Sequence, residues 1–149
     1  MKKLIDAYLY KIINNNVQFL VLKRSNKTIY AGQWRMIGGK VKAGETYWQA
    51  AQREVDEELS ITPQLFWSVP TINRFYEPET DEIHVIPPFA VQLKKEDKFV
   101  LNYEHSEYSW IETSQIDEYI KWPEQRRIMK LINEIVTEDE ILEDWIINI

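Results

Sequence analysis

The segment Thr46–Leu59 constrains the fold of this chain more than any other, because its side chains divide into two stripes at helical spacing. At about 100° per residue, Glu57 and Glu58 lie within about 60° of Glu54 around a helix. The apolar side chains occupy a separate arc about 100° away: Trp48, Ala51, Val55 and Leu59. The segment therefore predicts a helix that packs one stripe on a sheet and carries three carboxylates on the neighbouring stripe.

Carboxylates at this spacing repel one another, by roughly a few tenths of a kcal/mol per exposed pair. A hard divalent cation such as Mg²⁺ or Mn²⁺, which prefers oxygen ligands, would relieve that repulsion. Arg53 can reach Glu57 one turn further along, which leaves Glu54 and Glu58 for the metal. On the three glutamates alone, an ordinary acidic, solvent-facing stripe is nevertheless the favoured interpretation.

Two glycines, Gly38 and Gly39, precede this segment. Glycine lets the backbone approach a ligand closely and leaves a carbonyl accessible for coordination. We expect an extended stretch over 34–37 to end at this pair, and a loop to lead from it to the helix. Glu45 is placed to cap that helix or to complement its dipole. By themselves, the glycines would indicate only a turn.

The glycines and the helix together form a spaced pattern. Gly39 is followed after five residues by Glu45 and, after seven more, by the run Arg53-Glu54-Val55-Asp56-Glu57-Glu58-Leu59-Ser60-Ile61. This pattern closely resembles the signature of the Nudix hydrolase family, from which only Ser60 departs, standing where the family has glycine. The flanking runs 19–24 and 32–40 also resemble the family, and the resemblance covers roughly residues 4–136.

The resemblance implies an enzyme in which water attacks a phosphorus of a pyrophosphate bridge with the help of Mg²⁺, or of Mn²⁺. It implies that Glu54 and Glu58 bind the metal, and that Glu57 and the carbonyl of Gly38 support the metal site. Arg53 is expected to orient the glutamates. Glu54, Arg53 and Glu57 are accordingly the candidate catalytic residues within the pattern.

The resemblance also implies a further carboxylate outside the pattern, which acts as base or metal ligand. Glu104 is the candidate, since it lies on a loop just before an expected strand. Glu107 is the alternative. The two histidines, His84 and His105, are interpreted as surface or hydrogen-bonding residues. Four side chains are candidates for substrate contacts, although the last is interpreted first as a packing residue: Arg24, Arg35, Lys40 and Trp34.

Ser60 stands where the family's glycine ends the helix, often with positive φ. A serine in that conformation is expected to cost up to about 1 kcal/mol, unless the helix ends by another geometry. No charged position of the pattern is altered, so we expect an effect on stability rather than on activity.

The order of strands and helices predicts an α+β fold with a central mixed β-sheet in an α/β/α sandwich, as the resemblance also implies. Strands are expected over 4–13, 17–22, 66–75, 84–93 and 108–111, and further helices over 113–120 and 123–136. The first two strands should form a hairpin through Asn14–Asn16, and Pro87-Pro88 predicts an edge or a bulge. The resemblance implies a Nudix domain over residues 1–136, and the tail of the same domain, 137–149, is expected to dock on the core, to contact a second subunit or to fray.

The net charge of −6 is unevenly distributed, because residues 1–53 carry ten basic and only two acidic side chains. A basic first part beside an acidic helix suits an anionic ligand held through a metal, whereas the overall acidic balance argues against a nucleic-acid partner. The absence of cysteine excludes disulfides and thiolate metal sites. With no signal peptide and no membrane-spanning run, we expect a cytoplasmic protein without a membrane partner.

Residues 103–111 and 122–126 resemble a bacterial group of dATP pyrophosphohydrolases, also called dihydroneopterin triphosphate pyrophosphatases. That resemblance favours a (d)NTP, dATP or dihydroneopterin triphosphate as the substrate, with pyrophosphate and the monophosphate as products. A pyrophosphatase of nucleoside diphosphate sugars, ADP-ribose or dinucleotides is the alternative. A non-catalytic nucleotide-binding module also stays open, as does a homodimer that uses Trp145–Ile149.

Overall fold

Two antiparallel strands, β1 (Leu4–Ile13) and β2 (Asn16–Arg24), form the centre of the sheet in the computed structural model, which describes residues 2–149. Asn14 and Asn15 connect these strands with φ angles of 51° and 65°. Asparagine visits this left-handed region more readily than most residues, so the expected hairpin and its turn chemistry are confirmed.

Shorter strands complete the sheet. β4 (Ile37–Lys40) pairs with the first half of β1, and β3 (Trp34–Arg35) pairs with the last residues of β2. β8 (Pro88–Gln92) runs parallel to β1, whereas β5 (Leu65–Ser68) runs antiparallel to β8. β9 (His105–Glu112) pairs antiparallel with β2. The sheet is therefore mixed, as expected.

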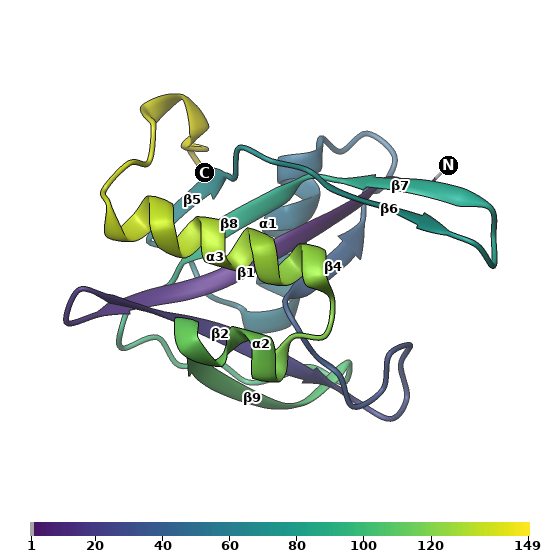
Figure 1. Cartoon of the computed structure of the whole chain (residues 1–149), viewed down its shortest axis with the longest axis horizontal. Coiled ribbons are helices and arrows are strands. Elements are labelled where there is room, and N and C mark those ends of the chain that lie inside the picture. Colours follow the sequence, from purple (N-terminus) through teal and green to yellow (C-terminus); the bar gives the residue numbers. More distant parts are fainter. Residues whose placement is uncertain (1) are drawn as a thin grey trace.

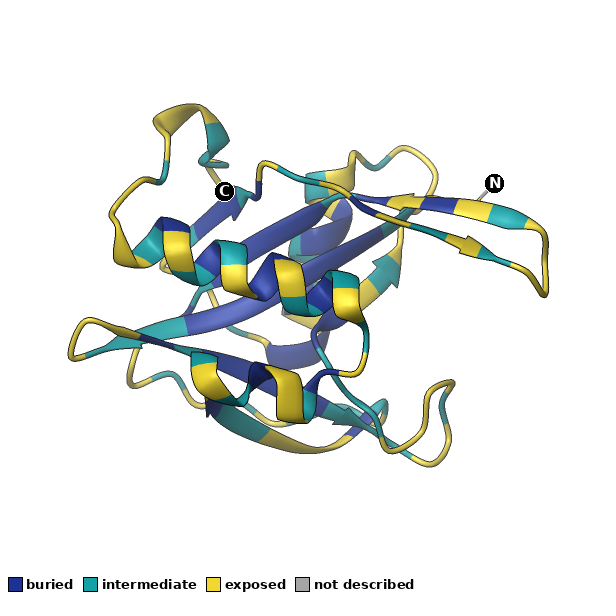
Figure 2. Ribbon diagram, in the orientation of Figure 1, coloured by how far each residue is buried: buried dark blue, intermediate teal, exposed yellow. Residues whose placement is uncertain are grey.

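Helices cover both faces of this sheet (Figure 1). α1 (Tyr47–Leu59) packs on one face, where it meets side chains that alternate along β1, beginning at Ile5. α2 (Ile116–Tyr119) and α3 (Pro123–Thr137) cover the other face, which receives Tyr8 and Tyr10. Figure 2 shows that the buried residues concentrate in the strands between these layers. The α/β/α sandwich is thereby confirmed.

Two expected strands are each divided in the structure. The stretch 66–75 contains most of β5 and the start of β6 (Asn73–Glu77), whereas 84–93 contains the end of β7 (Glu82–Ile86) and all of β8. β6 and β7 form a separate hairpin that projects from the body (Figure 1). The expectation of an edge or bulge at Pro87-Pro88 is wrong, because the chain leaves one sheet and enters the other there. Proline cannot donate to a strand ladder, which is why the break falls at this point.

Smaller differences concern the ends of elements. β9 begins earlier than the expected 108–111, and 113–120 is a 3₁₀ turn, Thr113–Gln115, followed by the single turn of α2. Gly38 and Gly39 lie within β4 rather than in a loop, because their backbone pairs with β1. Thr46 caps α1 through a capping box with Gln49, so the expectation that Glu45 caps this helix is wrong.

The tail, 137–149, docks on the edge of the sheet, which is the first of the three alternatives expected for it. Trp145 stacks on Trp67 with ring centroids 6.2 Å apart. Ile146 forms a bridge with Trp67, and the Ile147 amide donates to the Phe66 carbonyl at 2.8 Å. The docked tail thus covers the otherwise unpaired edge of β5. Within residues 2–149, no helix combines the length and apolar character needed to cross a membrane.

Ser60 ends α1 in the left-handed conformation, with φ 52° and ψ 43°, and its amide donates to the Asp56 carbonyl at 2.8 Å. This is the conformation that glycine adopts at no steric cost. We therefore expect Ser60→Gly to raise the free energy of unfolding by up to about 1 kcal/mol, measured by urea denaturation, with catalytic activity unchanged. A destabilised variant would contradict this and would indicate that the contact of the serine hydroxyl with the Asp56 carbonyl, at 3.4 Å, outweighs the strain.

Candidate active site

Arg53 lies at the centre of an ion-pair network. Its Nε and Nη2 donate to the two carboxylate oxygens of Glu45 at 2.7 and 3.0 Å. Nη1 donates to Glu54 at 2.9 Å and to Glu57 at 3.3 Å, while Nη2 also donates to the carbonyl of Lys40 at 2.9 Å. The hydrogen bonds to Glu45 raise the pKa of Arg53, so the guanidinium stays charged. The structure therefore brings Arg53 against two of the glutamates that it was expected to orient.

Glu54 lies against the backbone of Gly39. A Cβ atom at Gly39 would stand 2.4 Å from Cδ of Glu54, so any larger residue at this position would displace the carboxylate. The Glu54 side chain is 13% exposed. Burial raises the pKa of this carboxyl, although the hydrogen bond from Arg53 opposes the shift. A buried, perturbed carboxyl held in one position is typical of a catalytic or metal-binding group.

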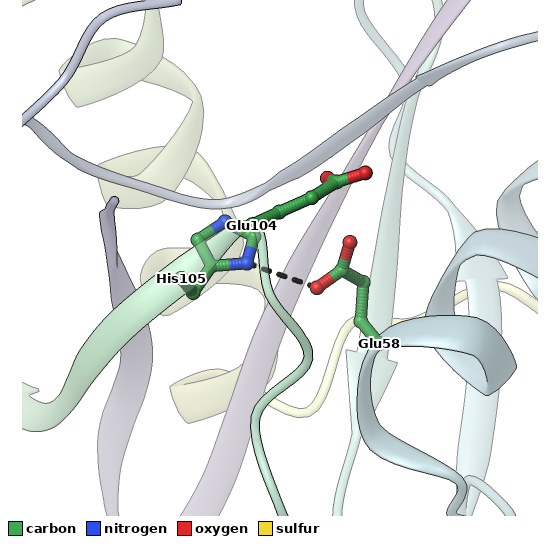
Figure 3. Close-up of side chains that lie close together, drawn as sticks. All are labelled: Glu58, Glu104 and His105. Carbon is green, nitrogen blue, oxygen red and sulfur yellow. Dashed lines mark hydrogen bonds and ion pairs between the residues drawn. The ribbon is translucent and has the colours of Figure 1, made fainter. Parts of the chain in front are cut away.

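Glu58 and His105 form a buried pair between α1 and the start of β9 (Figure 3). His105 Nδ1 donates to Glu58 Oε2 at 2.9 Å, and each side chain is 2% exposed. Burial alone would raise the pKa of Glu58, but the hydrogen bond and the charge of His105 leave it lowered. His105 thus has the hydrogen-bonding role that was one of its two expected interpretations. The pairing holds Glu58 in a fixed orientation.

Glu104, the residue directly before β9, lies close to the Glu58–His105 pair. Ligand atoms of Glu58, Glu104 and His105 lie within 4.8 Å of one another. Burial, and next the proximity of Glu58, raise the pKa of Glu104. Arg24 Nη1 stands 3.5 Å from Glu104 Oε2. Glu107, the alternative to Glu104, is instead 60% exposed and pairs with Lys23 at 3.3 Å.

The donor set fits a hard divalent cation. Glu54, Glu57 and Glu58 come from successive turns of one helix face, and Glu104 faces Glu58 from another element. All four offer carboxylate oxygens, which are the ligands that Mg²⁺ and Mn²⁺ prefer. Burial raises the pKa of Glu54 and of Glu104, and a cation bound by these carboxylates would favour their charged forms.

The four candidate substrate contacts lie in different places. Arg24 is beside Glu104, and Arg35 lines the cavity described below. Lys40 is exposed at the end of β4, and its carbonyl accepts a hydrogen bond from Arg53. Trp34 is half-buried and packs edge-on against Tyr119 and the core beneath α3, and it is not among the residues that line the cavity.

A cavity of about 400 Å³ opens on the other side of Gly38 and Gly39. Its lining includes six polar or aromatic side chains that sequence reasoning either missed or did not bring together: Asp6, Arg35, Asn73, Phe75, Trp122 and Gln125. Burial raises the pKa of Asp6 to about 6, against the opposing hydrogen bond from Asn73. Little in the sequence pointed to this cavity, because Asp6 is only a single acid in an apolar strand and the other residues belong to distant segments.

A second group of two carboxylates and a histidine lies on the β6–β7 hairpin. Glu77, Glu82 and His84 have ligand atoms within 4.8 Å of one another. His84 Nε2 lies 2.6 Å from Glu77 Oε2, which agrees with a hydrogen-bonding role for this histidine.

Comparisons with known proteins agree with this architecture. A family model described as the NUDIX domain matches residues 2–132. Nucleoside triphosphatase NudI of Salmonella typhimurium is 28% identical over 116 residues, which are 72% of this chain and 82% of that protein. An Ap4A hydrolase of C. elegans, solved as a binary complex, superposes with a TM-score of 0.78 at 20% identity, over 93% of this chain and 99% of that chain. The dihydroneopterin triphosphate pyrophosphohydrolase of E. coli superposes with a TM-score of 0.73 at 23% identity, over 88% of this chain and 94% of that one.

Proposed function

Because this chain belongs to the Nudix family and is a Nudix hydrolase, we propose that it hydrolyses a pyrophosphate bond in a nucleoside triphosphate or a similar compound. The substrate is a (d)NTP, dATP or dihydroneopterin triphosphate, and the products are pyrophosphate and the monophosphate. The observation that carries this proposal is the approach of Glu104 to Glu58, on the helix where Arg53 holds Glu54 and Glu57. The Salmonella relative, described as a nucleoside triphosphatase, supports the same class of substrate.

Glu54, Glu57 and Glu58, with the carbonyl of Gly38, are the groups that we propose hold Mg²⁺ or Mn²⁺. Once bound, such a cation neutralises charge on the phosphoryl oxygens and lowers the pKa of coordinated water. Arg53 keeps Glu54 and Glu57 in place, because its guanidinium is itself held by the ion pair with Glu45.

Glu104 is proposed as the group that accepts the proton of the attacking water. Its raised pKa brings it nearer to the operating pH, where a general base is most effective. Arg24, at 3.5 Å from Glu104, and Lys40 are proposed to contact the phosphates from the basic part of the chain. Trp34 was a further candidate, and its packing against Tyr119 favours a structural role.

Metal dependence and product analysis test this proposal together. The protein is incubated with Mg²⁺ and dATP, dGTP, dihydroneopterin triphosphate, ADP-ribose, a nucleoside diphosphate sugar or a dinucleoside polyphosphate, and the products are separated by ion-exchange chromatography. We expect a triphosphate to yield pyrophosphate and the monophosphate. EDTA should reduce the rate by at least roughly 100-fold, and excess Mg²⁺ should restore it.

Each other outcome has a definite meaning. Faster cleavage of ADP-ribose, a sugar nucleotide or a dinucleotide would favour the pyrophosphatase of nucleoside diphosphate derivatives. Binding of a nucleotide with no metal-dependent turnover of any compound would favour the non-catalytic module. A rate that is insensitive to EDTA would contradict the proposed metal site.

A further inference from the structure

Unpaired polar atoms gather around the cavity beside Gly38 and Gly39. Four buried side-chain polar atoms lack a hydrogen-bond partner in residues 2–149, and two of them, Arg35 Nη1 and Gln125 Oε1, belong to side chains that line this cavity. The hydroxyl of Tyr8 is a third, on the same face of β1 as Asp6. Leaving such groups unpaired is costly, so native structures seldom do so without a reason. A ligand that supplies the missing partners is such a reason.

Asp6 adds a buried carboxylate to the same lining. It is 5% exposed, and Asn73 Nδ2 donates to its Oδ2 at 3.1 Å. A carboxylate can accept several hydrogen bonds, more than this single one from Asn73. Asp6 and the unpaired Gln125 Oε1 can therefore accept hydrogen bonds from a ligand in the cavity, and the unpaired Arg35 Nη1 can donate one. Glu124 also lines the cavity, but both of its carboxylate oxygens already accept from Arg127.

The walls of the cavity are aromatic and suit a planar ring. The ring of Trp122 lies 5.8 Å from that of Tyr30 and 6.0 Å from that of Phe75. The guanidinium of Arg35 lies over the Tyr30 ring, 4.5 Å from its centroid. Aromatic side chains of this kind stack on heterocyclic bases, and a volume of about 400 Å³ is within the range of small-molecule sites.

We propose that this cavity binds the ring of the substrate and selects the 2-amino-4-oxopyrimidine edge that guanine and pterin share. This edge presents the N–H groups of a ring nitrogen and an exocyclic amine, which match the acceptors Asp6 and Gln125. Its carbonyl oxygen matches the donor Arg35. Adenine has no such pair of adjacent N–H donors, because a ring-nitrogen acceptor stands beside its amine and would face an acceptor of the protein.

The inference rests on the proposed function in one respect, since it assigns the ring and the phosphates to the same molecule. Gly38 and Gly39 provide the link between the two sites. Both line the cavity, and Gly39 also lies against Glu54 on the other side of β4.

Metal-free binding isolates the ring from the phosphate chemistry. The affinities of GMP, IMP, AMP and 7,8-dihydroneopterin are measured by isothermal titration calorimetry at pH 8. We expect GMP or dihydroneopterin to bind at least roughly tenfold more tightly than AMP, because AMP leaves buried polar groups unpaired. IMP, which differs from GMP only by the missing 2-amino group, should bind about tenfold more weakly than GMP. The tighter of GMP and dihydroneopterin identifies the natural ring, whereas equal affinity for GMP and AMP, or no binding of any of the four, would overturn the inference.

Variants test the assigned residues. Asp6→Asn keeps the shape of the side chain but replaces one of its two acceptor oxygens with an N–H donor, and it should reduce the preference for GMP over AMP by about tenfold. Gln125→Leu should act in the same direction, which keeps the test decisive if Asp6→Asn disturbs the contact with Asn73. Trp122→Leu is the matched control, because loss of a stacking surface should weaken all rings alike and leave the preference unchanged. If all three variants changed affinity without changing preference, the assigned edge would be wrong.

The same experiments separate this inference from the proposed function. A protein that binds GMP selectively but hydrolyses no triphosphate would contradict the proposed function and support the cavity assignment. A protein that hydrolyses dATP and dGTP at equal rates, and binds AMP and GMP alike, would contradict only the inference.

Discussion

Replacing Glu54 with Gln should lower kcat by roughly 10²–10⁴-fold, the range expected when a group that directly assists proton transfer or metal binding is lost. The substitution keeps the shape of the side chain against Gly39 and an oxygen for the hydrogen bond from Arg53. It removes the negative charge that the proposed cation requires. Initial rates at saturating Mg²⁺ and substrate measure the effect, and circular dichroism verifies the fold.

Asp56→Asn provides the matched control for this variant. Asp56 lies on the same helix and is exposed, so the substitution removes the same charge from outside the cluster. We expect its rate to stay within about twofold of the wild type, as is usual for surface positions away from a site. Equal losses in the two variants would show that the net charge of α1, rather than the Glu54 carboxylate, governs the rate.

Trp145→Ala should lower the free energy of unfolding by about 2–3 kcal/mol, somewhat less than the loss of a fully buried tryptophan. Trp145 is half-buried and covers Trp67, whose own side chain is fully buried and whose Nε1 donates to the Tyr10 hydroxyl at 2.9 Å. Removing the outer ring exposes the inner one to water and leaves the edge of β5 less protected. The midpoint of thermal unfolding should fall by roughly 5–10 °C.

Leu142→Ala tests whether the effect belongs to this contact or to the whole tail. Leu142 is 54% exposed, so its truncation should cost less than about 0.5 kcal/mol. Hydrolytic activity should persist in both variants, since neither residue lies in the proposed site. A Trp145→Ala protein as stable as the wild type would show that the docked tail contributes little to folding.

Local patterns in the sequence predicted the elements that depend on local interactions. The apolar stripe of Thr46–Leu59 predicted α1, and Pro123 with its following stripe predicted α3. The asparagines at 14 and 15 predicted the turn of the first hairpin. Ser60 adopts the positive φ that its place in the signature predicted. In each case, residues within a few positions of one another carry the relevant free energy, so the pattern can be recognised without the rest of the chain.

Predictions were less successful where the outcome depends on which segments meet. An apolar run such as 84–93 indicates extended structure, but it cannot show that the chain changes sheets at Pro87. The same holds for His105, whose place against Glu58 follows from the packing of β9 near α1. Local side-chain patterns carry no information about such a partner.

Local patterns of residues were thus enough to predict the carboxylate-bearing helix, its spacing from Gly39 and the Nudix family of the chain. Packing between distant segments accounts for three further features: Glu104 faces Glu58, the tail covers Trp67, and one cavity is lined by Asp6, Arg35 and Gln125. The physical reason is the range of the interactions. Helical periodicity and turn chemistry act between near neighbours, whereas a cavity lined by β1, β3 and α3 exists only after the sheet and the helix on that face have packed together.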